Sequence, residues 1–161
     1  MSLTKLGKIV NTHGIKGEIR LISDFKYKDR VFKKDFTIYI KDRPCIIESY
    51  RPHKNFDMVT LVGFYNINQV LDLVKNNAYV KIEDLNLLPN EYLDDMIIGY
   101  NTEFNGNLIG TITGIRFNPS NDLLEIKTDS GIKLVPNKDH FIENINHDSQ
   151  IITLKNCEGL L

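Results

Sequence analysis

The first strong structural signal in the chain is the segment Gly7-Lys-Ile-Val-Asn-Thr-His-Gly-Ile-Lys-Gly-Glu-Ile-Arg20. At both of its ends β-branched residues partly alternate with polar ones, which is typical of strands. Residues 12–17, which lie between these ends, have the composition of a turn. We therefore expect two strands, over residues 6–11 and 18–23, joined by a short connection.

The rest of the first half is also rich in strand-like segments, with one exception. Apolar residues at Ile67, Val70 and Val74 recur at helical spacing. Asn66 is placed to cap the first turn, so a helix is expected over residues 67–75, where it would plug or flank a barrel. Further strands are expected over residues 36–41, 45–51, 58–62 and 78–83.

The strand pattern starts again after Pro89. Asn105-Gly106 is the strongest short hairpin signal in the chain, because both central residues of the favoured turn need positive φ. The predicted fold class is therefore all-β, with two small β-barrel domains and one or two short helices. The expected domains are residues 1–88 and 89–161, the second including the junction at 89–96, with strands over 97–100, 108–117, 123–128, 132–136 and 151–154.

Formal charge divides unequally between these two halves. Residues 1–88 contain 15 Lys and Arg against 10 Asp and Glu, which gives +5. Residues 89–161 contain 5 against 11, which gives −6. Such asymmetry indicates a nucleic-acid contact on one side and a basic partner on the other, although solvated charged faces also produce it.

Motifs that carry catalysis are missing from the sequence. The 4 histidines show no zinc-binding spacing, and there is no nucleophile elbow, Walker loop or dinucleotide fingerprint. We therefore expect no enzymatic activity, no metal and no cofactor. A hydrolase built from scattered histidines stays a weaker alternative.

The sequence also indicates where the protein works. No signal peptide and no long uncharged apolar run is readable, so no contact with a membrane is expected. Cys45 and Cys157 lie far apart in sequence, which favours free thiols in a reducing compartment. A cytoplasmic location and a monomeric state are expected.

The turn-like connection combines two glycines with a cation. Gly14 and Gly17 would let the backbone approach a partner closely, so that backbone N–H groups and Lys16 could face phosphate together. Alternatively, the glycines only shape a tight barrel corner, and His13 caps the loop. A Gly-x-x-Gly loop also occurs in KH domains, where it lies between helices, whereas the flanks here alternate like strands.

Residues 7–20 resemble the amino-terminal signature of the RimM family, with its His-Gly-Ile-Lys-Gly-Glu core at residues 13–18. The resemblance continues in order to the end of the chain. It includes the predicted helix, the Leu88-Pro89 junction, Ile98-Gly99, residues 108–113, 121–126 and 134–136, and the terminal Glu158-Gly-Leu-Leu161.

The resemblance implies a barrel similar to those of translation factors, followed by a PRC-type barrel. It also implies a non-catalytic factor that binds the small ribosomal subunit and its head protein nineteen, and that assists maturation of the head region of small-subunit rRNA. A general RNA or protein interaction scaffold is the alternative, because fold alone does not fix function.

Combined with the charges, the resemblance predicts two contact surfaces. The first domain would touch rRNA, although a solvated strand end is an equally good interpretation of Arg51 and Lys54. The predicted RNA or ribosome contacts are Lys8, His13, Gly14, Lys16, Gly17, Arg20, Arg51 and Lys54.

The acidic second domain would hold the ribosomal protein, with charge steering the encounter and apolar groups anchoring it. Two positions depart from the family pattern, since Leu93 follows Tyr92 where a second aromatic is common, and Asn137 follows Pro136 where an apolar residue is usual. Tyr92 could equally be a packing residue. The predicted protein contacts are Tyr92, Leu93, Asp94, Asp95, Asp122, Pro136 and Phe141.

Overall fold

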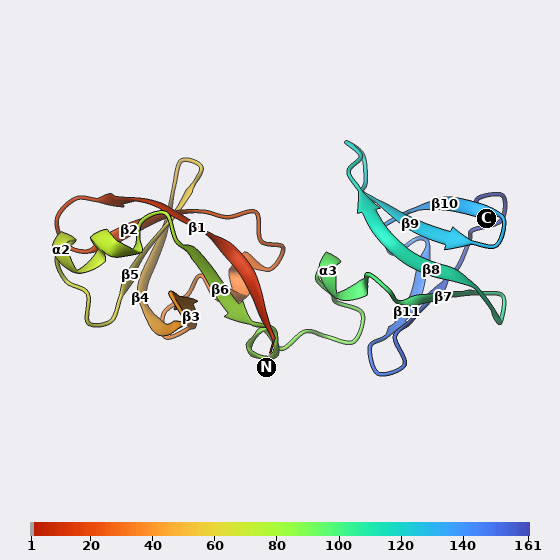
Figure 1. The fold of residues 1–161 in the computed structure, drawn as a ribbon, viewed down its shortest axis with the longest axis horizontal. Helices are drawn as coiled ribbons and strands as arrows, with labels where there is room; N and C mark the ends of the chain where they lie inside the picture. The colour runs from red at the N-terminus through yellow and green to blue at the C-terminus, as the bar shows by residue number, and fades with distance from the viewer. Residues whose placement is uncertain (1) are drawn as a thin grey trace. The chain divides into compact units, whose positions relative to one another are not determined.

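The computed structural model describes residues 2–161, in which strands form most of the regular structure (Figure 1). The chain divides into two compact units, the first ending at Asn86 and the second beginning at Leu87. The predicted fold class, all-β in two β domains with few short helices, is confirmed.

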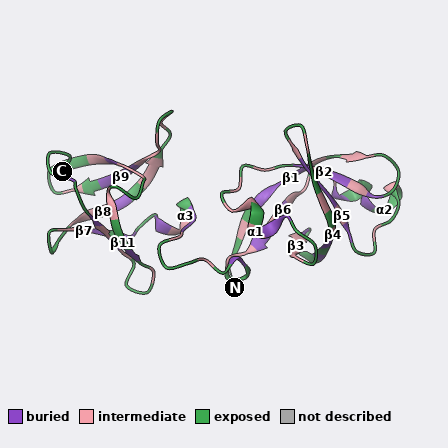
Figure 2. Ribbon diagram, turned by 180° about the vertical axis from the view of Figure 1, so that it is seen from behind, coloured by how far each residue is buried: buried purple, intermediate pink, exposed green. Residues whose placement is uncertain are grey.

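The first unit is a closed barrel of six strands in the order β1-β2-β5-β4-β3-β6. Buried residues alternate with exposed ones along several of these strands (Figure 2), which gives the barrel an apolar interior. The strands are β1 (Leu3–His13), β2 (Glu18–Ile22), β3 (Thr37–Ile40), β4 (Arg43–His53), β5 (Phe56–Leu61) and β6 (Asn77–Lys81).

Strand β1 closes the barrel by pairing on both sides. Its first half pairs with β6 and its second half pairs with β2. The register shifts between Lys5 and Gly7 on one side and between Ile9 and Asn11 on the other. Such bulges bend a strand and increase its twist, and β1 needs both changes to serve two neighbours of a closed sheet.

The helices of this unit are α1 (Lys28–Val31), α2 (Ile67–Val70) and the 3-10 turns η1 (Leu71–Leu73) and η2 (Ile82–Leu85). Asn66 caps α2 in a capping box with Gln69, as predicted. The expected length of this helix, 67–75, is wrong, because the α-helix ends after one turn and η1 follows. Lys75 adopts positive φ and its N–H donates to the Ile9 carbonyl at 2.7 Å, so the chain leaves the helix to join β1.

A buried carboxylate links α1 to the barrel wall. Asp57 on β5 is 4% exposed and accepts hydrogen bonds from Lys28 Nζ at 2.8 Å and from the Tyr50 hydroxyl at 2.7 Å. The Tyr50 ring stacks on Phe32, with 5.1 Å between ring centroids. Burial, together with the hydrogen bond and the charge of Asp57, raises the pKa of Tyr50 to about 12.

The second unit contains α3 (Asp94–Ile97) and a six-stranded sheet in the order β10-β9-β8-β7-β12-β11. All neighbours are antiparallel except β12 and β7, which are parallel. The strands are β7 (Asn101–Phe104), β8 (Asn107–Arg116), β9 (Leu123–Thr128), β10 (Gly131–Pro136), β11 (Ile142–Asn146) and β12 (Ile151–Leu154).

Two local predictions for this unit have different outcomes. The hairpin at Asn105-Gly106 is confirmed, because both residues have positive φ and join β7 to β8. The strand expected over residues 97–100 is wrong, because Ile97 ends α3 and Gly99 has a φ of +91°, so strand β7 begins only at Asn101. Strand β11 was not expected.

One apolar core and one hydrogen-bonded chain hold the second unit together. The Tyr100 hydroxyl meets His147 Nδ1 at 2.9 Å, and His147 Nε2 donates to the Glu91 carbonyl at 2.9 Å. This chain ties the segment before α3 to the turn between β11 and β12. The core consists of Tyr92, Ile97, Tyr100, Ile112, Leu124, Ile126, Val135, Ile145, Ile152, Leu154 and Cys157.

We predict that Asp57→Asn lowers the free energy of unfolding by about 2 kcal/mol, because the buried side chain loses its charge and can no longer accept from both Lys28 and Tyr50. The pKa of Tyr50 should fall from about 12 but stay above its ordinary value, since burial remains. A raised phenol pKa stabilises the fold below the unfolded pKa of 10.0, and this contribution is lost as pH rises through about 12.

Urea unfolding at neutral pH and the ultraviolet absorbance of tyrosinate measure these two effects. Asp24→Asn is the matched control, because Asp24 is an exposed carboxylate that precedes α1 in the same unit. Equal stability of the Asp57 and Asp24 variants would contradict a structural role for the buried carboxylate.

Candidate functional site

Four adjacent strands of the first unit, β1, β2, β5 and β4, carry a group of basic and aromatic side chains. Because Ile19 and Leu21 are fully buried in the barrel, the alternate residues of β2, Glu18 and Arg20, face outward. Cross-strand pairing continues the row, since Arg20 lies opposite Met58 and Met58 lies opposite Arg51, although the Met58 side chain itself is covered and fully buried. We call the set His13, Arg20, Arg51, His53 and Lys54 the basic face.

Arg20 is the most constrained cation of the basic face. Its guanidinium lies over the Phe56 ring, 4.8 Å from the centroid, and its Nη2 is 2.8 Å from His13 Nδ1. Arginine can only donate, so His13 Nδ1 accepts, and the neutral ring keeps its proton on Nε2. Among the described side chains, Arg20 Nε is buried without a hydrogen-bond partner.

Arg51 is held by a two-point ion pair with Glu18. Arg51 Nε and Nη2 donate to the two carboxylate oxygens at 2.9 and 2.7 Å. The hydrogen bond and the charge of Arg51 hold the pKa of Glu18 below its ordinary value. The pair neutralises the carboxylate and fixes the orientation of the guanidinium, so the net charge of the face stays positive.

Two imidazole rings lie next to each other on this face. The centroids of His13 and His53 are 5.7 Å apart. Desolvation lowers the pKa of His53, and the nearby charges of Arg51 and Lys54 act in the same direction. His53 is therefore neutral at neutral pH, and a neutral ring between cations is a surface on which a nucleobase can stack.

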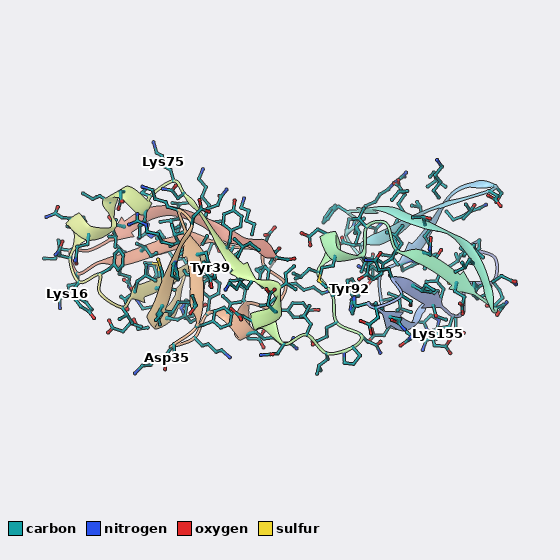
Figure 3. The ribbon with its side chains drawn as sticks, turned by 60° about the horizontal axis from the view of Figure 1, so that its bottom comes forward. Lys16, Asp35, Tyr39, Lys75, Tyr92 and Lys155 are labelled. Carbon is teal, nitrogen blue, oxygen red and sulfur yellow. The ribbon has the colours of Figure 1, made fainter. Side chains whose placement is uncertain are left out.

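The loop between β1 and β2 borders the basic face. Gly17 has a φ of +94°, and a Cβ at this position would lie 2.5 Å from the Phe64 carbonyl oxygen. The Ile67 N–H donates to the Ile15 carbonyl at 2.9 Å, which fixes the loop on the start of α2. The Lys16 side chain extends outward from this end of the barrel (Figure 3).

A shallow hollow of about 430 Å³ opens beside this loop. Ile15 is 73% exposed, which is unusual for a large aliphatic side chain on a loop held by hydrogen bonds. The hollow is lined by His13, Gly14, Ile15, Lys16, Glu18 and Thr60.

The structure brings most of the predicted RNA contacts together. His13, Arg20 and Arg51 are direct neighbours, and Lys54 occupies the turn between β4 and β5. Lys8 lies apart from them, exposed on β1 opposite Ile22 and Asn77.

The two glycines have different surroundings. Gly17 is buried and its close contact is with its own chain at Phe64, as the barrel-corner alternative requires. Gly14 is exposed, and a Cβ added there would meet no other part of the chain within 4 Å, so its backbone is open to a partner. The strands that flank the loop differ from the helices that flank a KH loop.

The predicted protein contacts of the second unit fall into two groups. Tyr92 and Leu93 are 7% and 5% exposed, and the Tyr92 hydroxyl donates to Asn137 Oδ1, so both side chains pack within the unit. Asp94 and Asp95 are exposed in the first turn of α3.

Of the remaining predicted contacts, Asp122 and Pro136 lie at the start of β9, and Phe141 directly precedes β11. The Asp122 carbonyl accepts from the Asn137 N–H at 2.8 Å, and the preceding Pro136 pairs with Leu123. Phe141 is half-buried, with the Lys138 ammonium 5.8 Å from its ring centroid.

Phe117 was not predicted as a contact, yet it is the most exposed large apolar side chain described, at 86%. It follows β8 directly, and Arg116 pairs with Leu123, so Phe117 lies at the same end of the sheet as Asp122. The sequence places Phe117 at the end of a predicted strand, directly before the turn residues Asn118-Pro119, and an aromatic residue at that position could have been recognised as exposed. An aromatic ring beside carboxylates is suited to anchor a cationic protein.

Metal-ligand groups, membrane-spanning helices and the two cysteines are the other features that bear on the function of residues 2–161. No group of three or more His, Cys, Asp or Glu side chains there is arranged to hold a metal ion. No helix in that range is long and apolar enough to cross a membrane. Cys45 and Cys157 are both free and buried, and burial raises the pKa of each thiol.

Two family models match the chain. The RimM N-terminal domain matches residues 4–85, and the RimM PRC barrel domain matches residues 94–160. Over 166 residues the chain is 38% identical to the ribosome maturation factor RimM of Bacillus mycoides strain KBAB4, covering 97% of this chain and 96% of that protein. Its counterpart in Bacillus thuringiensis strain Al Hakam is 36% identical with the same coverage.

Two solved structures are similar to the chain. A crystal structure of RimM from Pseudomonas aeruginosa has a TM-score of 0.42 and 18% identity, covering 96% of this chain and 97% of that one. The solution structure of the N-terminal domain of RimM from Thermus thermophilus has a TM-score of 0.46 and 20% identity, covering 53% of this chain and 95% of that one.

We predict that Gly17→Ala destabilises the first unit more than Gly14→Ala does. Both residues have positive φ, so each alanine costs about 1 kcal/mol of backbone strain. Only the Gly17 variant adds a clash with the Phe64 backbone, which cannot move without disturbing α2. Urea unfolding of the two variants measures the difference, and equal midpoints would contradict the tight contact between the loop and Phe64.

Proposed function

This chain belongs to the RimM family, and from that membership we propose that it is a non-catalytic ribosome maturation factor that binds the small ribosomal subunit. The observation that carries the proposal is the match of both family domains, in order, along nearly the whole chain. The curated relatives named ribosome maturation factor cover 97% of it, so the proposal concerns both units and not one shared module.

The basic face of the first unit would contact rRNA. It presents guanidinium groups whose orientation is fixed by Phe56 and Glu18, and imidazole rings lie between them. Fixed cations bind phosphate with little loss of side-chain entropy, and rings stack on unpaired bases. The formal charge of +5 on residues 1–88 also favours binding to a polyanion such as rRNA.

The second unit would hold a basic ribosomal protein, which we propose to be small-subunit protein nineteen. Asp94 and Asp95 are exposed on α3, and Phe117 is exposed beside Asp122. Carboxylates raise the rate of encounter with a cationic protein, and a desolvated aromatic ring prolongs the complex. Tyr92 and Leu93 would act indirectly by supporting this surface, because both are buried.

Holding RNA and protein together is sufficient for an assembly role. A factor that binds one arrangement of the two components more tightly than others shifts the population towards that arrangement. No covalent bond changes in this mechanism, so no catalytic group, metal or cofactor is required of the chain.

We predict that the purified protein sediments with free small subunits and much less with large subunits or assembled ribosomes, over a series of salt concentrations. It should also bind isolated protein nineteen saturably. Equal binding to every particle, falling steeply with salt, would show only attraction to phosphate and would favour the general scaffold instead.

We predict that the double variant Asp94→Asn and Asp95→Asn weakens binding to protein nineteen about fivefold at low salt, because two steering charges are lost. The difference should shrink as salt rises. Calorimetric titration measures it. Asp129→Asn with Asp148→Asn is the matched control, since both residues are exposed carboxylates in other turns of the unit. Equal affinities of the two double variants for protein nineteen would contradict a contact between that protein and α3.

A further inference from the structure

We infer that the hollow beside the β1–β2 loop, lined by Ile15, Lys16, His13 and Thr60, is a binding site for an unpaired nucleobase of single-stranded RNA. The inference rests on the proposed function, because it assigns a specific ligand class to the RNA-binding side. It goes further by separating a base-binding site from the cations that bind phosphate.

The hollow has an apolar wall at Ile15 that is set before any ligand arrives. Ile15 is 73% exposed, although its own carbonyl is tied to Ile67 and the nearby Gly17 is packed on Phe64. A loop fixed in this way does not lose conformational entropy when it binds a ligand. When a flat apolar ring covers an exposed aliphatic surface, the burial of apolar area lowers the free energy of the complex.

The lining of the hollow includes a hydrogen-bond donor on the His13 ring. Because Arg20 donates to His13 Nδ1, the remaining ring proton is on Nε2. His13 lines the hollow, and a base edge carries carbonyl and ring-nitrogen acceptors that such a donor can meet. Glu18 also lines the hollow, but its carboxylate is engaged by Arg51.

Charge decides which class of ligand the hollow takes. Lys16 lines the hollow, and Arg20 and Arg51 hold the two lining residues His13 and Glu18, whose carboxylate is neutralised by Arg51. This surplus of positive charge is complementary to a polyanion and unfavourable for a basic ribosomal protein. Apolar surface interleaved with cations is the pattern of single-strand binding, in which bases stack while phosphates pair.

Duplex RNA does not fit this arrangement. In A-form helices the bases are stacked inside, and proteins reach mainly phosphates and 2′-hydroxyls. An apolar hollow can only be filled by a base that has left the stack. The site therefore selects loops, bulges or ends of rRNA, or strands that have not yet paired.

The test compares three RNAs by fluorescence anisotropy. They are a labelled uridine octamer, an abasic octamer with the same phosphates, and a duplex of equal length. The wild-type chain should bind the uridine octamer about fivefold or more tightly than the abasic octamer, because base contacts contribute in addition to phosphate contacts. The duplex should resemble the abasic octamer.

Variants test whether the tighter binding of the uridine octamer than of the abasic octamer depends on the hollow. Ile15→Ala should remove the preference for bases while keeping affinity for the abasic octamer, and Lys16→Ala should weaken both equally. Ile22→Ala and Lys34→Ala are the matched controls, since Ile22 is 52% exposed on β2 and Lys34 is exposed before β3. Circular dichroism confirms that each variant is folded.

Two outcomes would overturn the inference. Equal wild-type affinity for the uridine and abasic octamers would show that the face binds phosphate alone. Loss of small-subunit binding in Ile15→Ala, with unchanged octamer binding, would show that the hollow takes a protein. Both outcomes leave the proposed function standing, which fails only if the wild-type chain does not sediment selectively with small subunits.

Discussion

The two-sided pairing of β1 is the constraint on which the first unit depends. One strand must serve β6 with its first half and β2 with its second, and the bulges near Lys5 and Ile9 make this possible. Closure then sets the neighbours of every outward side chain. His13 at the end of β1 meets Arg20 on β2, and β5 places Phe56 under the same guanidinium. The basic face is thus a product of the pairing of β1, β2, β5 and β4.

Much of the fold could be predicted from local sequence, because strand alternation and turn residues act over short distances. Asn105-Gly106 and the Asn66 cap are examples. Predictions failed where tertiary contacts override local preference. The helix after Asn66 is cut short because Lys75 pairs with Ile9, and Gly99 delays the start of β7.

The candidate site was predictable in composition but not in geometry. Gly14, Lys16 and Gly17 left two interpretations open from sequence alone, a phosphate-binding loop and a tight barrel corner. The contact between Arg20 and Phe56 depends on the pairing of β2 with β5, which no local pattern encodes. Burial likewise separates Tyr92, whose hydroxyl bonds Asn137, from Phe117, which is exposed. Two aromatic residues thus differ in role through their surroundings.

The parallel pairing of β12 with β7 has a consequence for synthesis of the chain. Residues 151–153 must join residues 101–103, so the sheet of the second unit cannot be completed until residue 153 has been made. The first barrel needs nothing beyond β6 and can close while translation continues. Pairing between distant segments is slow to form, so the acidic unit matures last. The nascent chain therefore completes its basic face before the acidic sheet of the second unit.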